Sequence, residues 1–486
     1  MIEEALFRAA LAAEASGDIQ GAIEGYEAIL AKQPGCPEAL TNLGVLASRS
    51  GDSESALLFY EEAVRNAPTF VPARLNRARV LMRTGDMANA LGDLERVIAD
   101  GSVEPSVHAD RAHVLLMLGR PREALAHAEA AAARMPDRAL WLVLGNALLA
   151  HRRPREAELS YRKVPEDGAR MRANLGLALM AQGRFDEAWP YYEARYDETL
   201  QAHDVVRFDS MPCPQWAGEN LSGKRVLVVG EQGFGDQIQF VRFIEVVAQA
   251  GAHVELICRP ALASLLGTAP GVSKVHVSAH NALETTFDYW TPMLSLPYRL
   301  GVGDPRKTWT YPYLQADEAK RAYWKHQLAA WGGNKRKVGL VWSGAAGNSN
   351  NRMRSMGEAN VIAMVNGLTD RNCFVALQKG LLLDSIEPLC RAGIIPLEDV
   401  LKDFSDTAAL EAELDLVITV DTATAHEAGA LGRPTWVLLF AGADWRWGDT
   451  LGEVRCVSYP SQRLFWRTLE ETNWDRVVAE VRAGLQ

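Results

Sequence analysis

The stretch RVLVVGEQGFGDQIQF, residues 225–240, decides how the second half of this 486-residue chain is interpreted. After Arg225 it continues with a short apolar run, residues 226–229, typical of a buried parallel strand. A glycine-rich turn, Gly230–Asp236, follows, and then a helical stretch begins. Such a turn presents free backbone N–H groups and the positive end of a helix dipole, which favours an anion or another close ligand. Its glycines are spaced GxxGxG and GK[ST] is missing, so it is neither a dinucleotide-binding GxGxxG turn nor an ATPase phosphate loop.

Strands and helices continue to alternate after this stretch. The predicted strands are HVELICRP (253–260), KVHV (274–277), FDYWTPMLSLP (287–297), KVGLVWSG (337–344), CFVALQKG (373–380), DLVITV (415–420) and PTWVLLFAG (434–442). The segment 300–336 separates two sets of them. Two doubly wound sheets facing each other across a cleft are the simplest arrangement, with ligands at the carboxyl ends of the strands.

The part of the chain before residue 200 repeats with a period of 34 residues. The residues that keep this spacing are Gly17, Gly51, Gly85 and Gly119, and, five positions later, Ala22, Ala56, Ala90 and Ala124. We expect each unit to be a helical hairpin with glycine in the turn, alanine where the helices touch, and a proline such as Pro34 ending the second helix. Looser fifth and sixth units end near Tyr161 and Tyr192. One hairpin cannot bury its apolar face alone, so the hairpins should stack into a solenoid.

Composition excludes several classes of protein. There are 61 acidic and 51 basic side chains, giving a net charge of −10, which argues against a protein that coats nucleic acid. No stretch approaches the roughly 18 apolar residues needed to span a bilayer, and the start lacks the features of a signal peptide. The six cysteines form no CxxC pair. We therefore expect a cytoplasmic chain with no integral membrane segment and no nucleic-acid partner.

Two loops at strand ends carry the first candidate residues. Asp236 can cap the helix that follows it, or it can act as a general base at the edge of the cleft, and the two roles are compatible. The loop 344–356 contains asparagines that turn the backbone, Asn348 and Asn350 among them, and arginines that suit a phosphate. A guanidinium suits a phosphate because its planar fork makes bidentate charge-assisted bonds. A solvated basic loop is the alternative.

A third loop, 421–432, follows the strand at 415–420. Asp421 can accept hydroxyl groups of a sugar or ribose, Thr422 and the neighbouring amides can face a phosphate, and His426 can donate to a leaving phosphate. A purely structural histidine is the alternative. We expect Asp236 and His426 to be catalytic. The expected donor-binding residues are Gly233, Gly235, Ser343, Arg352, Arg354, Ser355, Gln378, Asp421, Thr422 and Ala423.

Different parts of the chain resemble two different families. The repeats resemble the tetratricopeptide repeat family. GEQGFGDQIQF, FDYWTPMLSLP, VGLVWSG followed by RMRS, and VDTATAHEAGALGRP with DWRWG downstream resemble the heptosyltransferase-like group, glycosyltransferase family 9. The combination looks like bacterial proteins that fuse such repeats to such a domain. The resemblance implies an α-solenoid at 1–199, followed by an α/β GT-B fold of two Rossmann-like domains at 200–318 and 319–486, the latter binding the donor.

The resemblance also implies an activity. It points to an inverting transfer of a sugar from a nucleotide-activated donor, with Asp236 as base and Arg354 neutralising the leaving diphosphate. No DxD motif occurs in the chain, so we expect neither a metal nor another cofactor. Heptosyltransferases carry no repeats and act on lipopolysaccharide, so the solenoid points instead to a protein acceptor held in its groove, with flagellin as one candidate. The alternatives are a repeat scaffold with a degenerate transferase domain, and a lipopolysaccharide or capsule glycosyltransferase.

Overall fold

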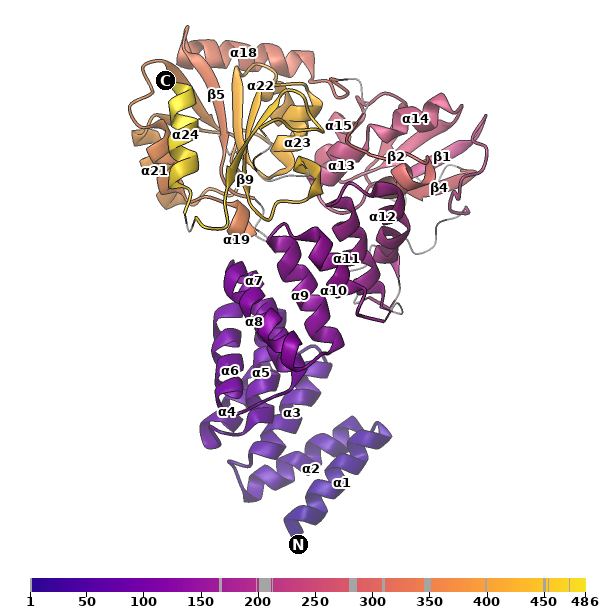
Figure 1. The fold of residues 1–486 in the computed structure, drawn as a ribbon, viewed down its shortest axis with the longest axis vertical. Coiled ribbons are helices and arrows are strands. Elements are labelled where there is room, and N and C mark those ends of the chain that lie inside the picture. Colours follow the sequence, from indigo (N-terminus) through magenta and orange to yellow (C-terminus); the bar gives the residue numbers. More distant parts are fainter. Residues whose placement is uncertain are drawn as a thin grey trace. The chain divides into compact units, whose positions relative to one another are not determined.

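The computed structural model describes the chain apart from residues 1, 166–167, 198, 201–210, 212, 279–285, 308–310, 345–350, 398–399, 449–451, 453 and 472. The chain forms two compact units, Met1–Leu148 and Leu149–Gln486. Figure 1 shows that the first is built of helices and that both sheets belong to the second. The last predicted repeat units therefore pack with the α/β part. The domain boundaries predicted at 199/200 and 318/319 stay predictions.

Consecutive helices of the first unit form hairpins, as the 34-residue period predicts. These helices are α1 (Ile2–Ser16), α2 (Ile19–Lys32), α3 (Pro37–Arg49), α4 (Ser53–Asn66), α5 (Val71–Thr84), α6 (Met87–Ala99), α7 (Pro105–Met117) and α8 (Pro121–Arg134). Helix α9 (Arg138–Ala150) crosses the boundary between the units. The repeat glycines adopt left-handed φ angles of 83°, 87°, 90° and 71° in the turns, and all four repeat alanines are 0% exposed. Glycine is needed there because a Cβ is costly in the left-handed region.

An aspartate directly after the glycine fixes the start of the second helix in three hairpins. Asp18, Asp52 and Asp86 each accept a hydrogen bond from the backbone N–H three residues later, at 2.9–3.2 Å. These side chains satisfy N–H groups that a helix start otherwise leaves unpaired. The second helices end as the sequence predicts, with α2 finishing at Lys32 just before Pro34.

The second unit begins with further repeat helices and a short extension. Its first helices are α10 (Pro154–Tyr161), α11 (Ala169–Met180), α12 (Phe185–Tyr192) and the 3-10 turn η1 (Glu193–Tyr196). Tyr161 is fully buried in this segment and Tyr192 is 7% exposed. Helices α11 and α12 pack against each other as the sixth predicted unit requires, and α10 of the fifth unit packs against α11.

The first sheet has four parallel strands in the order β3-β2-β1-β4. Its strands are β1 (Arg225–Val229), β2 (His253–Ile257), β3 (Val272–His276) and β4 (Tyr289–Pro292). The helical segments that accompany it are α13 (Phe234–Phe240), α14 (Phe243–Gln249), η2 (Pro260–Leu262), α15 (Ala263–Leu266), η3 (Met293–Ser295) and α17 (Leu296–Arg299). We call this sheet with these helices the first lobe.

The second sheet has six parallel strands in the order β10-β9-β8-β5-β6-β7. They are β5 (Arg336–Val341), β6 (Asn372–Ala376), β7 (Ile394–Pro396), β8 (Leu416–Val420), β9 (Thr435–Phe440) and β10 (Gln462–Arg467). The accompanying helices are α18 (Glu318–Gly332), α19 (Asn351–Arg354), α20 (Glu358–Val365), α21 (Leu383–Arg391), α22 (Phe404–Glu411), α23 (Ala423–Ala430), η4 (Trp445–Trp447) and α24 (Asp475–Leu485). We call this sheet with these helices the second lobe. The sequence predicted neither β7 nor β10.

Strand order determines where a ligand can bind. The order in which strands are added to the sheet reverses between β1 and β4 in the first lobe, and between β5 and β8 in the second. Loops diverge from such a switch point and leave a crevice at the carboxyl ends of the strands. The lobes meet where α13, which follows β1, packs against α23, which follows β8. A Cβ on Gly235 would lie 2.7 Å from the His426 ring, so only glycine fits at this contact.

Candidate functional site

A cavity of about 580 Å³ lies at the carboxyl ends of the strands of both lobes. Its walls come from the loop after β1, the end of β5 with α19, and the loops after β6, β8 and β9. The structure thus brings the three predicted loops into one cavity. Of the predicted site residues, those that line it are Gly233, Gly235, Asp236, Ser343, Arg354, Gln378, Asp421, Thr422, Ala423 and His426.

Asp236 is fixed from two sides. It lies in the first turn of α13, and its Oδ2 accepts a hydrogen bond of 3.0 Å from the backbone N–H of Gly233. Its Oδ1 accepts a hydrogen bond of 2.7 Å from the Arg446 guanidinium of the second lobe. Asp236 therefore caps its helix while its carboxylate, 22% exposed, stays at the cavity wall.

Arg446 is a site residue that sequence reasoning missed. It is 8% exposed in η4 and also donates to the side chains of Gln239, at 2.9 Å, and Asp444. Burial lowers the pKa of Arg446, but the carboxylates of Asp444 and Asp236 outweigh burial and raise it. Arg446 is thus a permanent cation joining the two lobes. The DWRWG motif that contains Arg446 was the one sequence signal for it. That motif does not reveal the partner of Arg446, because Asp236 lies 210 residues away in the chain.

Two polar side chains hold the end of β5 in place, Gln378 from the loop after β6 and Ser355 from the second predicted loop. Gln378 Oε1 accepts hydrogen bonds from the backbone N–H groups of Trp342, at 3.1 Å, and Ser343, at 2.9 Å. Ser355 Oγ accepts from the N–H of Gly344 at 3.2 Å. Gln378 and Ser355 thereby shape the loop backbone, although Ser355 is not among the residues that line the cavity.

Arg354 lies directly over the backbone of Gly344. A Cβ added to Gly344 would come within 2.3 Å of the guanidinium, so the glycine makes room for it. The buried Nε of Arg354 has no hydrogen-bond partner among the described residues. Arg352, on the same short helix α19, is exposed and does not line the cavity. Asn348 and Asn350 lie outside the described residues.

The loop after β8 presents the start of α23 to the cavity. Thr422 is the N-cap residue, but its hydroxyl pairs with that of Thr419 at 3.0 Å rather than with a helix N–H. The first N–H groups of α23, from Ala423 onward, therefore face the cavity as potential anion donors. Burial, and then the nearby Asp444 carboxylate, raise the pKa of Asp421 to about 6.

His426 is buried between the lobes. Its ring stacks on Trp447 with centroids 4.8 Å apart, and Nδ1 lies 3.0 Å from the hydroxyl of Tyr459. Burial, followed by Arg446 and Arg242, lowers the pKa of His426 well below its ordinary value. The imidazole is therefore neutral and can donate one N–H bond, but it brings no positive charge to a phosphate.

Three further cations line the cavity and were not predicted. Arg259 donates a hydrogen bond of 2.8 Å to the backbone oxygen of Gln232, and Lys379 and Lys402 come from the loops after β6 and before α22. Together with Arg354 and Arg446 they give the wall five cationic side chains, beside the four aspartates Asp236, Asp403, Asp421 and Asp444. Such a wall suits a ligand with several phosphate oxygens.

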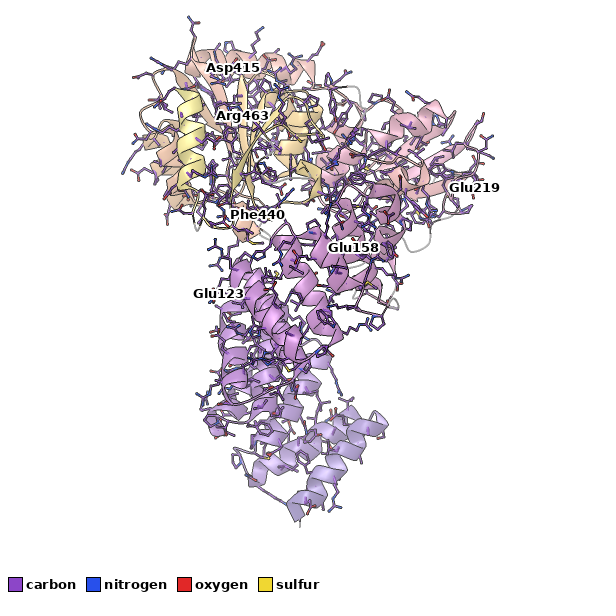
Figure 2. All side chains as sticks on the ribbon, in the orientation of Figure 1. Glu123, Glu158, Glu219, Asp415, Phe440 and Arg463 are labelled. Carbon is purple, nitrogen blue, oxygen red and sulfur yellow. The ribbon has the colours of Figure 1, made fainter. Side chains whose placement is uncertain are left out.

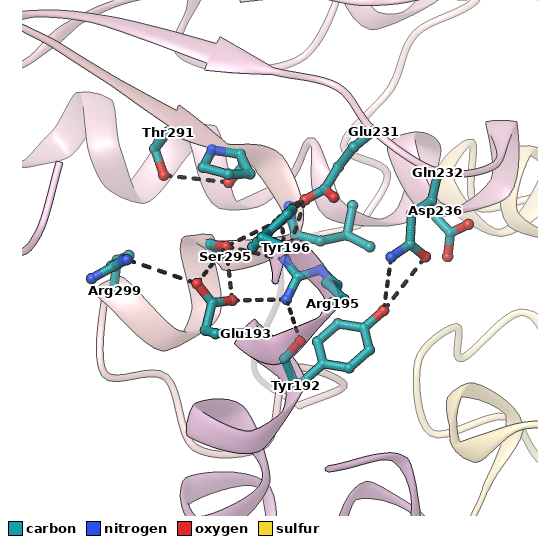
Figure 3. Close-up of polar contacts among 12 residues, drawn as sticks. Tyr192, Glu193, Arg195, Tyr196, Glu231, Gln232, Asp236, Thr291, Ser295 and Arg299 are labelled. Carbon is teal, nitrogen blue, oxygen red and sulfur yellow. Dashed lines mark hydrogen bonds and ion pairs between the residues drawn. The ribbon is translucent and has the colours of Figure 1, made fainter. Parts of the chain in front are cut away.

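A buried polar network lies beside the first loop (Figure 3). Glu231 is 3% exposed, and its Oε1 accepts hydrogen bonds from Arg195 at 3.3 Å, from the Leu294 N–H at 3.1 Å, and from the Tyr196 hydroxyl. Burial raises the pKa of Glu231 despite the nearby guanidinium of Arg195. The network links η1 to the loop that carries Asp236.

A protein-family model and a curated protein are similar to parts of this chain. A family model for the tetratricopeptide repeat matches residues 7–69 and 109–168. Protein FlbA of Caulobacter vibrioides is 31% identical over 361 residues, which cover 68% of this chain and 57% of FlbA. The match thus spans little more than half of that relative's length.

The solved structures that are similar to this chain include repeat proteins and a glycosyl transferase. TTC0263, a tetratricopeptide-repeat protein of Thermus thermophilus, is 23% identical, covering 37% of this chain and 99% of its own, with a TM-score of 0.30. A family 9 glycosyl transferase of Veillonella parvula is 13% identical, covering 52% of this chain and 88% of its own, with a TM-score of 0.41. The fold assignment rests on the repeats and strand order described above. The chain is a tetratricopeptide-repeat solenoid followed by a two-sheet α/β part of the GT-B type.

Among the described residues, no helix combines the length and the apolar character that crossing a bilayer requires.

All six cysteines are free, and Cys390 is exposed.

Proposed function

We propose that this chain is a glycosyltransferase that moves a sugar from a nucleotide-activated donor to a hydroxyl group of a protein. The single observation that carries the proposal is the presence of Asp236 and five cationic side chains on the walls of one cavity. A carboxylate fixed by Arg446 and the Gly233 N–H lies on the wall that also carries Arg354 and the start of α23. Sugar transfer needs a base at one end of the reacting bond and stabilised negative charge at the other.

Each group has a defined role in this proposal. Asp236 accepts the proton of the acceptor hydroxyl as its oxygen attacks the anomeric carbon. The bond to the nucleotide phosphate breaks, and Arg354 with the amides of α23 stabilises the charge on the departing phosphate. A single displacement of this kind inverts the anomeric carbon. His426 donates one hydrogen bond, and Asp421 accepts a ligand hydroxyl.

The first test replaces the proposed base. Asp236→Asn keeps an oxygen that can accept the Gly233 N–H, so the start of α13 stays capped while the base is lost. We expect turnover to fall about 10²–10⁴-fold and nucleotide affinity to hold. Asp444→Asn is the matched control, because it removes the other carboxylate from Arg446 without removing the base. Equal losses in both variants would show that Asp236 acts through charge alone.

The donor and the metal requirement are tested by binding. We propose that no metal or other cofactor is needed, because the cations that face the phosphates are side chains of the chain itself. A panel of nucleoside mono- and diphosphates, including CMP and UDP, identifies the base through the rise in thermal stability that a ligand gives. The same rise with EDTA present supports metal independence, and its disappearance contradicts it.

We propose a protein acceptor because the front of the chain consists of tetratricopeptide repeats, which suit peptide binding. Flagellin Ser and Thr hydroxyls are the first acceptors to try, with a cytoplasmic reaction. Removing residues 1–148, the first compact unit, should spare donor hydrolysis and abolish protein glycosylation. Equal glycosylation by the shortened chain contradicts recruitment by these repeats, and transfer to lipopolysaccharide instead contradicts the protein acceptor.

A further inference from the structure

Two non-glycine residues adopt left-handed backbone angles among the residues that the structure describes, and both lie at contacts of one helical segment. They are Arg152, with φ 52°, and Gln232, with φ 58°. Arg152 belongs to the segment 149–196, which contains α10, α11, α12 and η1. Gln232 lies in the loop of Asp236 and contacts the same segment. A strained backbone persists only where its surroundings hold it, and such positions gather at functional sites.

Arg152 occupies the position of the repeat glycine. Gly119 lies two residues before α8 with φ 71°, and Arg152 lies two residues before α10 in the same conformation. Its guanidinium donates to the backbone oxygens of Ala443, at 3.0 Å, and Gly448, at 2.8 Å. It also lies 4.9 Å from the ring centroid of Trp466. An arginine has therefore replaced the favoured glycine at the point where the segment meets the loop carrying Arg446.

The other end of the segment contacts the first lobe. The Tyr192 hydroxyl accepts a hydrogen bond of 3.0 Å from Gln232 Nε2, four residues before Asp236. Arg195 reaches Glu231 at 3.3 Å and Ser295 at 3.1 Å, and Glu193 accepts from Ser295 at 2.9 Å. Figure 3 shows these side chains gathered between η1 and the loop after β1.

The segment is itself held together by polar contacts. Glu158 of α10, labelled in Figure 2, accepts hydrogen bonds from Gln182 at 2.9 Å and Arg184 at 2.7 Å, in the turn between α11 and α12. Phe185 at the start of α12 packs edge-on against Trp445 of the second lobe, with ring centroids 5.5 Å apart. One linked body thus contacts both loops that supply the Asp236–Arg446 pair.

We propose that residues 149–196 act as a brace that sets the spacing of the two lobes at the Asp236–Arg446 pair, with Arg152 and Tyr192 as positioning residues. This inference rests on the proposed function only where donor hydrolysis is the quantity measured. The contacts that Arg152 and Tyr192 make then serve catalysis, whereas acceptor recruitment falls to the first unit. Positioning matters because a displacement of about 1 Å at a reacting centre can cost on the order of a hundredfold in rate.

The test uses the full-length chain with Arg152→Gly, Tyr192→Phe and the double variant. Arg152→Gly restores the glycine of the repeat, so the hairpin should fold at least as well while the contact to the second lobe is lost. Arg162→Ala is the matched control, since that arginine of the same segment pairs with Glu158 within it. We expect each single variant to lose about tenfold or more in donor-hydrolysis turnover, with nucleotide affinity unchanged and the control unaffected.

The double variant separates a brace from two local effects. If both contacts serve one brace, losing the second contact lowers turnover little further. The double variant should then have the same turnover as the less active of the two single variants. Independent effects would multiply instead. Multiplied losses, or full turnover in Arg152→Gly, overturn the proposal.

A distance measurement keeps the brace testable if the chain proves to transfer no sugar. Spin labels on the exposed Cys390 of the second lobe and on Lys274→Cys of the first, with Cys213→Ser removing the half-buried thiol, report the lobe spacing. We expect one narrow distance distribution in the parent and a broader one with Arg152→Gly. An equally narrow distribution in both overturns the brace. Absence of activity in the parent overturns only the proposed function.

Discussion

Two buried glutamates, one on α22 and one on α23, give a sharp prediction about pH. Glu411 ends α22 and Glu427 lies on α23, and both are 0% exposed. None of their carboxyl oxygens has a hydrogen-bond partner among the described residues. Burial raises the pKa of both groups well above 4.5, partly opposed at Glu411 by Arg433 and reinforced at Glu427 by Glu411 and Asp403.

The sign of the effect follows from proton binding. Above pH 4.5 the unfolded chain releases these protons while the folded chain keeps them, so the folded state binds more protons. The free energy of unfolding therefore falls as pH rises from 4.5 toward the raised pKa values. Each fully linked group contributes a slope of about 1.4 kcal/mol per pH unit.

Replacing Glu427 by leucine removes one of these slopes. Glu427→Leu should flatten the fall in unfolding free energy by about 1.4 kcal/mol per pH unit. At pH above neutrality it should raise stability, because the folded chain no longer has to keep a proton that the unfolded chain releases. Glu413→Gln controls for the change in net charge, because that carboxylate pairs with Arg321 near the surface.

Urea unfolding followed by tryptophan fluorescence between about pH 5 and 8 measures both quantities. The signal reports the second part of the chain, where eleven of the thirteen tryptophans lie. The same pH slope in Glu427→Leu and in the parent would refute the reasoning, since it would mean that Glu427 is ionised in the folded state. A flattened slope in Glu413→Gln would refute it equally.

Two further substitutions test the cavity and the lobe contact. Arg354→Ala should weaken nucleoside-diphosphate binding by about 1.5–3 kcal/mol, the worth of a charged hydrogen bond; unchanged affinity by calorimetry would remove Arg354 from the donor site. Gly235→Ala places a Cβ 2.7 Å from the His426 ring and should cost about 1–3 kcal/mol through overpacking; a melting temperature equal to the parent's would show that the lobes can separate freely there.

Much of the fold could be predicted because its signals are local. The 34-residue period needs only the glycines and alanines of each unit, and the apolar runs before Gly230 and Asp421 indicate buried strands. The two strands that were missed have weak local signals. β7 has only three residues, and β10 reads QRLFWR, with charge at both ends of its apolar centre.

The site was predicted less completely because it depends on contacts between distant residues. Each of the three loops could be placed at a strand end, and topology then brings them together. Nothing in the local sequence shows that Arg446 pairs with Asp236, or that Arg152 reaches the loop after β9. The exposed side chain of Arg352 was also beyond prediction, because its neighbour Arg354 has the same chemistry and only the direction of a short helix separates them.

The boundary between Leu148 and Leu149 has a practical consequence for retargeting. A graft that exchanges the front array for one with another peptide preference should be joined there, inside α9, and not at the later point where the helices give way to the first strand. A chimaera spliced near residue 200 would discard Arg152 and Tyr192 together with the front array. One spliced at 148 keeps both contacts, so under the proposed function the catalytic part would stay intact behind a new array.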